Sequence, residues 1–168
     1  NTSTETTQTS TTEDAAAQED TLPPPLETVS AMGPSFELQQ GAIAPPFSMV
    51  SIGGEKYAIA QRLGGHAFES KQGAVLVFFS TDCLTCVGNL KAFQKLESQW
   101  RAMGIDLVHI GVLENGSTLR EFFEESPIAW PVLADPHGIV AKRYGATSLP
   151  HWTFVDSNRK IALQVQHG

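Results

Sequence analysis

Cys83 and Cys86 are the only cysteines of this 168-residue chain, and two residues separate them. A continuous apolar run at 74–80 precedes the pair and predicts a strand that is buried on both faces. Apolar residues at steps of three and four follow it and predict a helix over 84–103. The unpaired N–H groups and the positive dipole end of such a helix stabilise a thiolate. We therefore predict that Cys83 is a nucleophile that forms mixed disulfides and that Cys86, one turn deeper, resolves them.

Three other uses of a CxxC pair compete with this interpretation. A structural zinc site needs four ligands, and the five histidines of the chain are scattered without ligand spacing. Covalent haem attachment requires a histidine directly after Cys86, where Val87 stands. A purely structural disulfide would close a very short loop, for which the entropic stabilisation is smallest. The pattern favours a redox-active disulfide between Cys83 and Cys86, with no metal and no dissociable cofactor.

The flanking sequence predicts the elements that hold this pair in place. Two short apolar runs joined by Gly53-Gly54 predict a β-hairpin over 47–60, and the same pattern predicts a second hairpin over 152–165. The other expected elements are a buried strand over 105–113, a capping box at 118–121 that opens a short helix, an apolar link over 131–134, and one or two helical turns over 138–144. Strands that alternate with helices imply an α/β fold, with a central sheet and a right-handed parallel crossover.

Charge is unevenly distributed along the chain. The formal net charge is −7, from 18 acidic and 11 basic residues. Seven of the acidic residues lie in the first 50 positions, which contain no Lys or Arg, so the remainder of the chain is balanced. This balance argues against a nucleic-acid groove, which needs many cations to neutralise phosphates. No apolar run approaches the roughly 18–20 residues that cross a bilayer.

The acidic part of the chain has the composition of a leader. Residues 1–40 are rich in Ser, Thr, acidic residues and Pro, so we predict a disordered segment ahead of a folded domain over 41–168. The chain begins at Asn1 without a signal-peptide apolar stretch, so a mature form or a fragment is expected. Thr-rich leaders are typical of stalks that hold exported domains away from a surface. An extracytoplasmic location is therefore expected, periplasmic or secreted, with a tether at the N-terminal end.

Further motifs follow in a defined order. They are APPF at 44–47, VLVFF at 75–79, Cys83-Leu84-Thr85-Cys86, WPVLAD at 130–135 and Leu149-Pro150. With these motifs, residues 41–167 resemble the thioredoxin superfamily, and more narrowly the TlpA/ResA-like (AhpC/TSA-redoxin-type) thiol-disulfide oxidoreductases. The resemblance implies a thioredoxin-like central mixed sheet with flanking helices and an N-terminal β-hairpin extension. It also implies that Pro150 is cis and packs against the disulfide, and that the backbone of Leu149 pairs with an incoming substrate strand.

The chain departs from the family pattern close to the cysteines. Asp82 stands where an aromatic residue is usual, and its carboxylate would disfavour the Cys83 thiolate. His151 follows the docking proline and would favour the thiolate as a cation, although a strand histidine that faces solvent is the simpler expectation. Val77 replaces the buried acid of thioredoxins, so the group that moves the proton of the resolving cysteine is not identified. The C-terminal helix of the family is not found before Gly168, so we expect either that the chain is truncated or that a partner, such as a second copy, covers one sheet face.

These observations predict an enzyme that exchanges electrons with protein dithiols and disulfides and is served by an upstream redox partner. Two alternatives remain open. A peroxiredoxin-like thiol peroxidase shares the fold and a loose [ST]-x-x-Cys pattern at 80–83. The proline expected four residues before Ser80 in such a protein is replaced by Leu76. A redox-inactive binding or assembly module with the same fold is favoured by the missing acidic groups. Turnover of a disulfide substrate, turnover of peroxide, or neither, distinguishes the three.

Overall fold

Strand β3 (Gly73–Phe79) is buried along its whole length, as its unbroken apolar sequence predicts. The computed structural model describes residues 38–69 and 71–167, and β3 lies at the centre of its larger sheet. The strand order of that sheet is β5-β4-β3-β6-β7. Strands β4 (Ile105–Val112) and β5 (Val132–Asp135) run parallel to β3, whereas β6 (His151–Asp156) and β7 (Ile161–Gln166) form an antiparallel hairpin on its other side. The sheet is therefore mixed, as expected.

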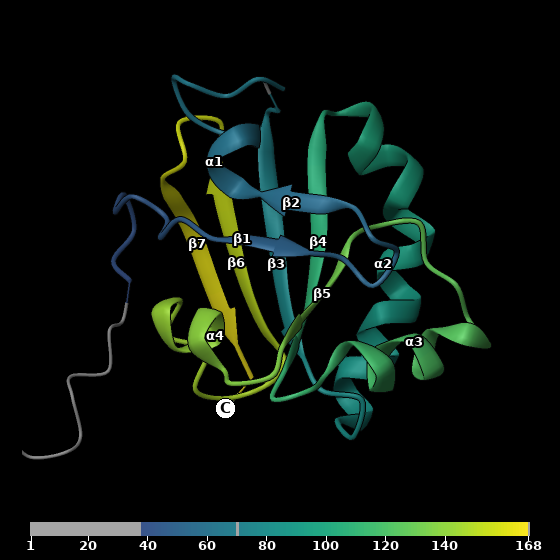
Figure 1. Ribbon diagram of the computed structural model, residues 1–168. Helices are drawn as coiled ribbons and strands as arrows, with labels where there is room; N and C mark the ends of the chain where they lie inside the picture. Colours follow the sequence, from purple (N-terminus) through teal and green to yellow (C-terminus); the bar gives the residue numbers. More distant parts are fainter. Residues whose placement is uncertain (1–37, 70, 168) are drawn as a thin grey trace, which may run out of the picture. The chain divides into compact units, whose positions relative to one another are not determined.

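Two layers of other elements cover this sheet (Figure 1). Helices α2 (Leu84–Ala102) and α3 (Gly116–Glu124) pack on one face. The other face carries α1 (Ile59–Arg62), α4 (Ile139–Arg143), and a hairpin of β1 (Ser48–Val50) and β2 (Lys56–Ala58). The hairpin was expected from Gly53-Gly54, whereas the single turn of α1 was not.

The alternation of side chains along β3 divides the core between these layers. Leu76 and Phe78 pack with residues of the hairpin, α1 and α4. Val77 and Phe79 point to the opposite face and pack with residues beneath α2 and α3. The buried strand thus joins the two halves of the core and ends directly before the cysteine pair.

Helix α2 matches the predicted helix, but its apolar stripe is only partly buried. Cys86 and Leu90 are its buried side chains, whereas Leu84 is 88% exposed. Leu84 lies in the first turn, beyond the carboxyl end of β3, so the sheet does not cover it. Apolar periodicity predicts the helix correctly and overestimates the length of its buried face.

The segment expected as an apolar link over 131–134 is a strand, and that expectation is wrong. Its residues pair with β4 from His109↔Val132 to Val112↔Asp135. On its other side the N–H of Ile52 donates to the carbonyl of Val132 over 2.8 Å, and Ser51 bridges to Leu133. Four residues are too few to display a strand period, and β5 exists because β4 and the hairpin flank it.

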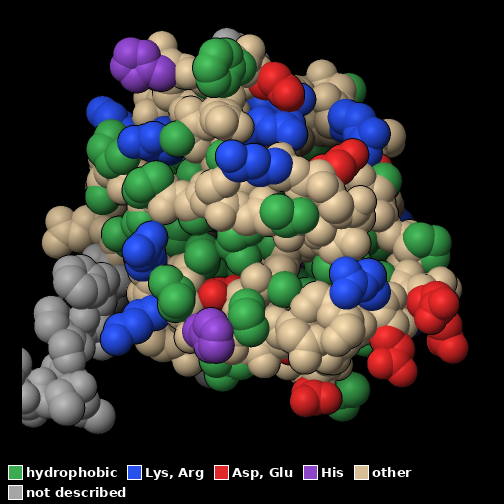
Figure 2. Space-filling model, in the orientation of Figure 1, with side chains coloured by type: hydrophobic (Ala, Val, Ile, Leu, Met, Phe, Trp, Pro, Cys, Tyr) green, Lys and Arg blue, Asp and Glu red, His purple; other side chains and the backbone are tan. Residues whose placement is uncertain are grey.

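Most of the predicted leader, residues 1–37, lies outside the described residues. The chain then joins the domain through hydrogen bonds from Gly41 to Ile161 and through a bridge between Ile43 and Lys160. Figure 2 shows acidic side chains gathered over α3 at the lower right, where Glu121, Glu124 and Glu125 are exposed. No helix in the described ranges is both long enough and apolar enough to cross a membrane.

Candidate functional site

Cys83 and Cys86 form a disulfide at the amino-terminal end of α2, with their Cα atoms 5.1 Å apart. Cys83 is the N-cap residue of this helix, and its Sγ accepts a hydrogen bond from the N–H of Cys86 over 3.1 Å. Cys86 is 1% exposed, whereas Cys83 is only partly buried. The structure therefore brings the two predicted site residues together and leaves Cys83 as the more accessible sulfur.

The position of this pair favours charge on one sulfur over the other. The N–H group that bonds Cys83 in the disulfide can also bond a Cys83 thiolate, at the positive end of the helix dipole. Cys86 packs with Phe79 and Leu90 in an apolar cluster, where burial disfavours a charged sulfur. The arrangement can thus support attack by Cys83 on a disulfide, followed by intramolecular closure.

Leu149 and Pro150 lie beside the pair, and the bond between them is cis, as expected. Leu149 packs against the apolar cluster that contains Cys86, as does Cys83. The carbonyl of Pro150 accepts a hydrogen bond from the N–H of His167 over 3.1 Å. Among the described residues, the backbone N–H and C=O of Leu149 make no backbone hydrogen bond.

The two residues predicted to tune the site differ in their surroundings. Asp82 is exposed, and its own N–H donates to the Ser80 hydroxyl over 3.3 Å. His151 is 3% exposed, so the expectation that its ring faces solvent is wrong. Its strand is paired on both sides, and the ring turns inward to pack edge-on against Phe78. Burial lowers the pKa of His151 and therefore favours the neutral ring.

Glu114 is a site residue that the sequence did not single out. Its Oε1 accepts hydrogen bonds from both the N–H and the hydroxyl of Thr81, two residues before Cys83. Its Oε2 is buried without a hydrogen-bond partner in the described part of the chain. A Cβ at Gly111 would lie 3.0 Å from this oxygen and 2.7 Å from Leu119, so a larger residue there would force these side chains to move. Glu114 thus holds the loop that leads into the disulfide.

A signal for Glu114 exists in the order of the strands. β3 and β4 are parallel neighbours, so the residues that follow each of them meet at one edge of the sheet. An acid just after the second strand therefore lies beside the loop after the first.

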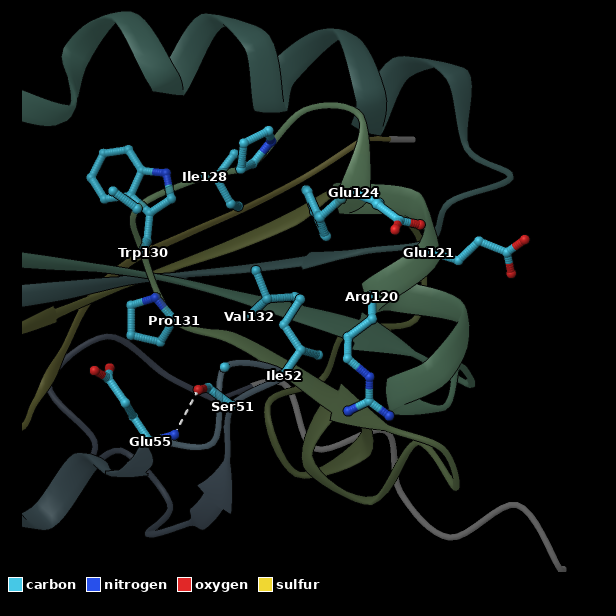
Figure 3. Close-up of a pocket in the computed structure, with 14 residues that line it drawn as sticks. Ser51, Ile52, Glu55, Arg120, Glu121, Glu124, Ile128, Trp130, Pro131 and Val132 are labelled. Atoms are coloured by element: carbon cyan, nitrogen blue, oxygen red, sulfur yellow. Dashed lines mark hydrogen bonds between the residues drawn. The ribbon is translucent and has the colours of Figure 1, made fainter.

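The hollow drawn in Figure 3 is separate from the disulfide. It has a volume of about 590 Å³ and lies between the hairpin turn, α3 and the segment before β5. Its floor is apolar, with Ile52 and Val132 pointing toward it, and Arg120 and Glu121 stand on the side of α3. Neither cysteine lines it.

A buried histidine lies beneath α2, away from both loops of the site. His109 is 0% exposed and is surrounded by the rings of Phe79, Phe93 and Trp130. Neither ring nitrogen has a hydrogen-bond partner among the described residues, and burial lowers the pKa of His109 to about 3. Within the described ranges, no three or more His, Cys, Asp or Glu side chains are grouped to hold a metal ion.

The mixed sheet, the disulfide at a helix N-terminus and the adjacent cis-proline together define a thioredoxin-fold thiol-disulfide oxidoreductase. Residues 40–164 match the family model described as the AhpC/TSA family. The chain belongs to this family, within which it is TlpA/ResA-like.

Known thiol-disulfide oxidoreductases are similar to this chain over most of its length. The thiol-disulfide oxidoreductase ResA of Bacillus thuringiensis subsp. konkukian is 22% identical over 130 residues, which cover 77% of this chain and 71% of that protein. The crystal structure of a putative thiol:disulfide interchange protein DsbE from Chlorobium tepidum superposes with a TM-score of 0.66, at 22% identity, over 77% of this chain and 86% of that one. A secreted Mycobacterium tuberculosis disulfide oxidoreductase homologous to E. coli DsbE gives a TM-score of 0.61, at 17% identity, over 73% and 84% of the two chains.

Proposed function

We propose that the protein exchanges electrons with disulfides and dithiols of other proteins, with Cys83 as the nucleophile and Cys86 as the resolving thiol. One observation carries the assignment of roles. Cys83 caps the helix, is the more accessible sulfur and accepts an N–H bond, whereas Cys86 is enclosed in the core. A thiolate at Cys83 is both stabilised and accessible, and a nucleophile needs both properties.

In the reducing direction the steps are as follows. The Cys83 thiolate attacks one sulfur of a substrate disulfide, a Cys83–substrate bond forms, and the other substrate sulfur leaves as a thiolate. Cys86 then loses its proton and attacks the Cys83 sulfur, which restores the Cys83–Cys86 disulfide and releases the second substrate thiol. Two electrons have moved to the substrate, and an upstream dithiol partner returns them by the same steps. The proposal needs no cofactor beyond the disulfide.

Leu149 and Pro150 are the proposed docking element. The free backbone groups of Leu149 lie beside the cluster that holds the cysteines, so a substrate strand paired there would present its disulfide to Cys83. Main-chain pairing of this kind recognises an extended backbone and accepts many sequences.

Export of the protein is part of the proposal. The resemblance to secreted and ResA-like proteins, together with the composition of residues 1–40, supports a site of action outside the cytoplasm, held by an N-terminal tether. Exposed Leu163 and Val165 on β7 are where a second copy would pack if the protein is a dimer, and sedimentation of the full chain would measure this.

The assignment of Cys83 is tested with a trapping variant. In Cys86→Ser the attack on the Cys83 sulfur is blocked. A mixed disulfide between Cys83 and insulin should therefore accumulate and survive non-reducing electrophoresis. The matched variant Cys83→Ser should trap nothing. Accumulation in Cys83→Ser instead would reverse the two roles, and turnover of peroxide with a sulfenic acid at Cys83 would favour the peroxidase alternative.

Asp82 is the proposed tuning group, whereas His151 is buried in its neutral form and would act on Cys83 only weakly. Replacing Asp82 by Ala removes a negative charge next to the nucleophile, which stabilises the thiolate and therefore the reduced state. Because Asp82 is exposed and screened, we expect the reduction potential to rise by about 10–30 mV. Equilibration with glutathione buffers measures the potential, and an unchanged or lower value would remove Asp82 from this role.

A further inference from the structure

One side chain of β7 joins the two ends of the loop that carries Leu149 and Pro150. The amide nitrogen Nε2 of Gln164 lies 2.9 Å from the carbonyl oxygen of Tyr144, at the start of this loop. The same atom lies 3.2 Å from Nε2 of His151, at the end of the loop. The docking segment is therefore closed by a bridge that comes from another strand.

The carbonyl of Tyr144 fixes the orientation of the Gln164 amide, because a carbonyl oxygen only accepts hydrogen bonds. Nε2 has one further hydrogen, and the Thr153 hydroxyl oxygen lies 3.0 Å from it. That hydroxyl is 3.1 Å from Nε2 of His151, to which it can donate its own hydrogen. Tyr144 and Thr153 thus use both hydrogens of the Gln164 amide, so the link from Gln164 to His151 runs through the Thr153 hydroxyl.

The bridge is partly buried. The hydrogen bonds of Gln164 lie at the edge of the core, whereas the contact between Thr153 and His151 is buried. Tyr144 and Thr153 are 0% exposed, and the ring of His151 packs on Phe78 of β3. The hydroxyl of Tyr144 points elsewhere and donates to the carbonyl of Pro45 over 2.6 Å.

We infer that the bridge from the Gln164 amide to the Tyr144 carbonyl and, through the Thr153 hydroxyl, to His151 positions the docking segment. Without this bridge, the loop end beside Leu149 would lose the hydrogen bonds that hold it to β7. This inference rests on the proposed function, since it concerns substrates that dock through the Leu149 backbone.

The bridge should affect the reaction rates of two kinds of substrate differently. A protein disulfide that pairs with Leu149 needs the loop in place, whereas a small disulfide without a peptide backbone reacts with Cys83 alone. Both reactions use the same thiolate, so the ratio of their rates cancels the ionisation of Cys83. Loss of the bridge should therefore lower the rate for a protein substrate relative to that for the small disulfide.

The test uses the reduced protein with insulin as the protein disulfide and cystamine as the small one. Gln164→Met removes the bridge while it keeps the length of the side chain. We expect the insulin-to-cystamine rate ratio to fall about tenfold, through KM, as the loss of one or two hydrogen bonds predicts. Gln99→Met, a matched change at an exposed position of α2, should leave the ratio unchanged.

Two variants of His151 separate positioning from simple packing. His151→Leu fills the site without an acceptor and should lower the ratio about tenfold, whereas His151→Gln restores an acceptor and should recover most of it. Unfolding curves confirm that each variant is folded.

The outcomes distinguish this inference from the function on which it rests. If the wild type does not reduce insulin, the proposed function fails. If the wild type reduces insulin but Gln164→Met and His151→Leu slow both substrates equally, or neither, the positioning role is overturned. A ratio in His151→Gln no better than in His151→Leu would remove His151 from the bridge.

Discussion

At the scale of single residues, the site depends on a carboxylate that lies outside both the CxxC motif and the Leu149-Pro150 segment. Glu114 bonds both polar groups of Thr81 and so fixes the loop that leads to Cys83. The cysteines could be predicted from the sequence because a strand–CxxC–helix pattern is local. Glu114 and Gln164 were missed, because each contacts a segment that is distant along the chain and becomes its neighbour only when the strand order is known.

Removal of the Glu114 carboxylate should therefore affect both stability and exchange. Glu114→Ala leaves the N–H and hydroxyl of Thr81 unpaired in a partly buried loop, so we expect the free energy of unfolding to fall by about 1–3 kcal/mol and insulin reduction to slow. Glu114→Gln retains an acceptor and should lose less. Urea unfolding and the insulin assay measure the two effects. Equal results for Glu114→Ala and for the exposed control Glu124→Ala would contradict the assigned role.

At the scale of elements, the sequence predicts what periodicity and local turn chemistry encode. β3, α2 and the β6–β7 hairpin lie where they were expected, because each has a long apolar pattern or a clear turn. β5 was missed because its pairing with β4 defines it. The start of α3 was displaced, since the N-cap is Asn115 and the predicted capping box at 118–121 lies inside the helix.

The N-cap of α3 can be tested by comparing Asn115 with the predicted capping box at 118–121. Oδ1 of Asn115 accepts a hydrogen bond from the N–H of Thr118 over 2.9 Å. Asn115→Ala should lower the free energy of unfolding by about 1 kcal/mol, Asn115→Asp should retain most of it, and Thr118→Ala should cost less than Asn115→Ala. Thermal unfolding measures the order of the three. A larger loss in Thr118→Ala would restore the capping box as the start of the helix.

At the scale of the whole molecule, one buried ring should govern stability in acid. Burial lowers the pKa of His109 to about 3 in the folded protein, against about 6.5 in an unfolded chain. Between these values the unfolded chain binds a proton that the folded one does not. The free energy of unfolding should therefore fall as the pH drops below about 6.5, by up to about 1.4 kcal/mol per pH unit from this group.

His109→Leu removes both unpartnered ring nitrogens and the titration. We expect this variant to be at least as stable as the wild type at neutral pH and to gain on it steadily toward pH 4. Urea unfolding at several pH values gives the difference between the two proteins. His137→Gln, at an exposed position, should keep the wild-type slope. A difference that does not grow in acid would mean that His109 is protonated in the folded protein.

The turn of the β1–β2 hairpin has a consequence for the edges of the large sheet. It pairs with β5 through Ile52 and Ser51, so this edge already has a neighbour. On the other side, in the part of the chain that the structure describes, residues 41–43 bond only to the start of β7 at Lys160 and Ile161. The remainder of β7 is the outer strand, with Leu163 and Val165 exposed along it. Any lengthening of the sheet by an added strand, whether in ordered assembly or in aggregation, is therefore directed to β7. The hairpin therefore leaves β7 as the more open edge of the sheet.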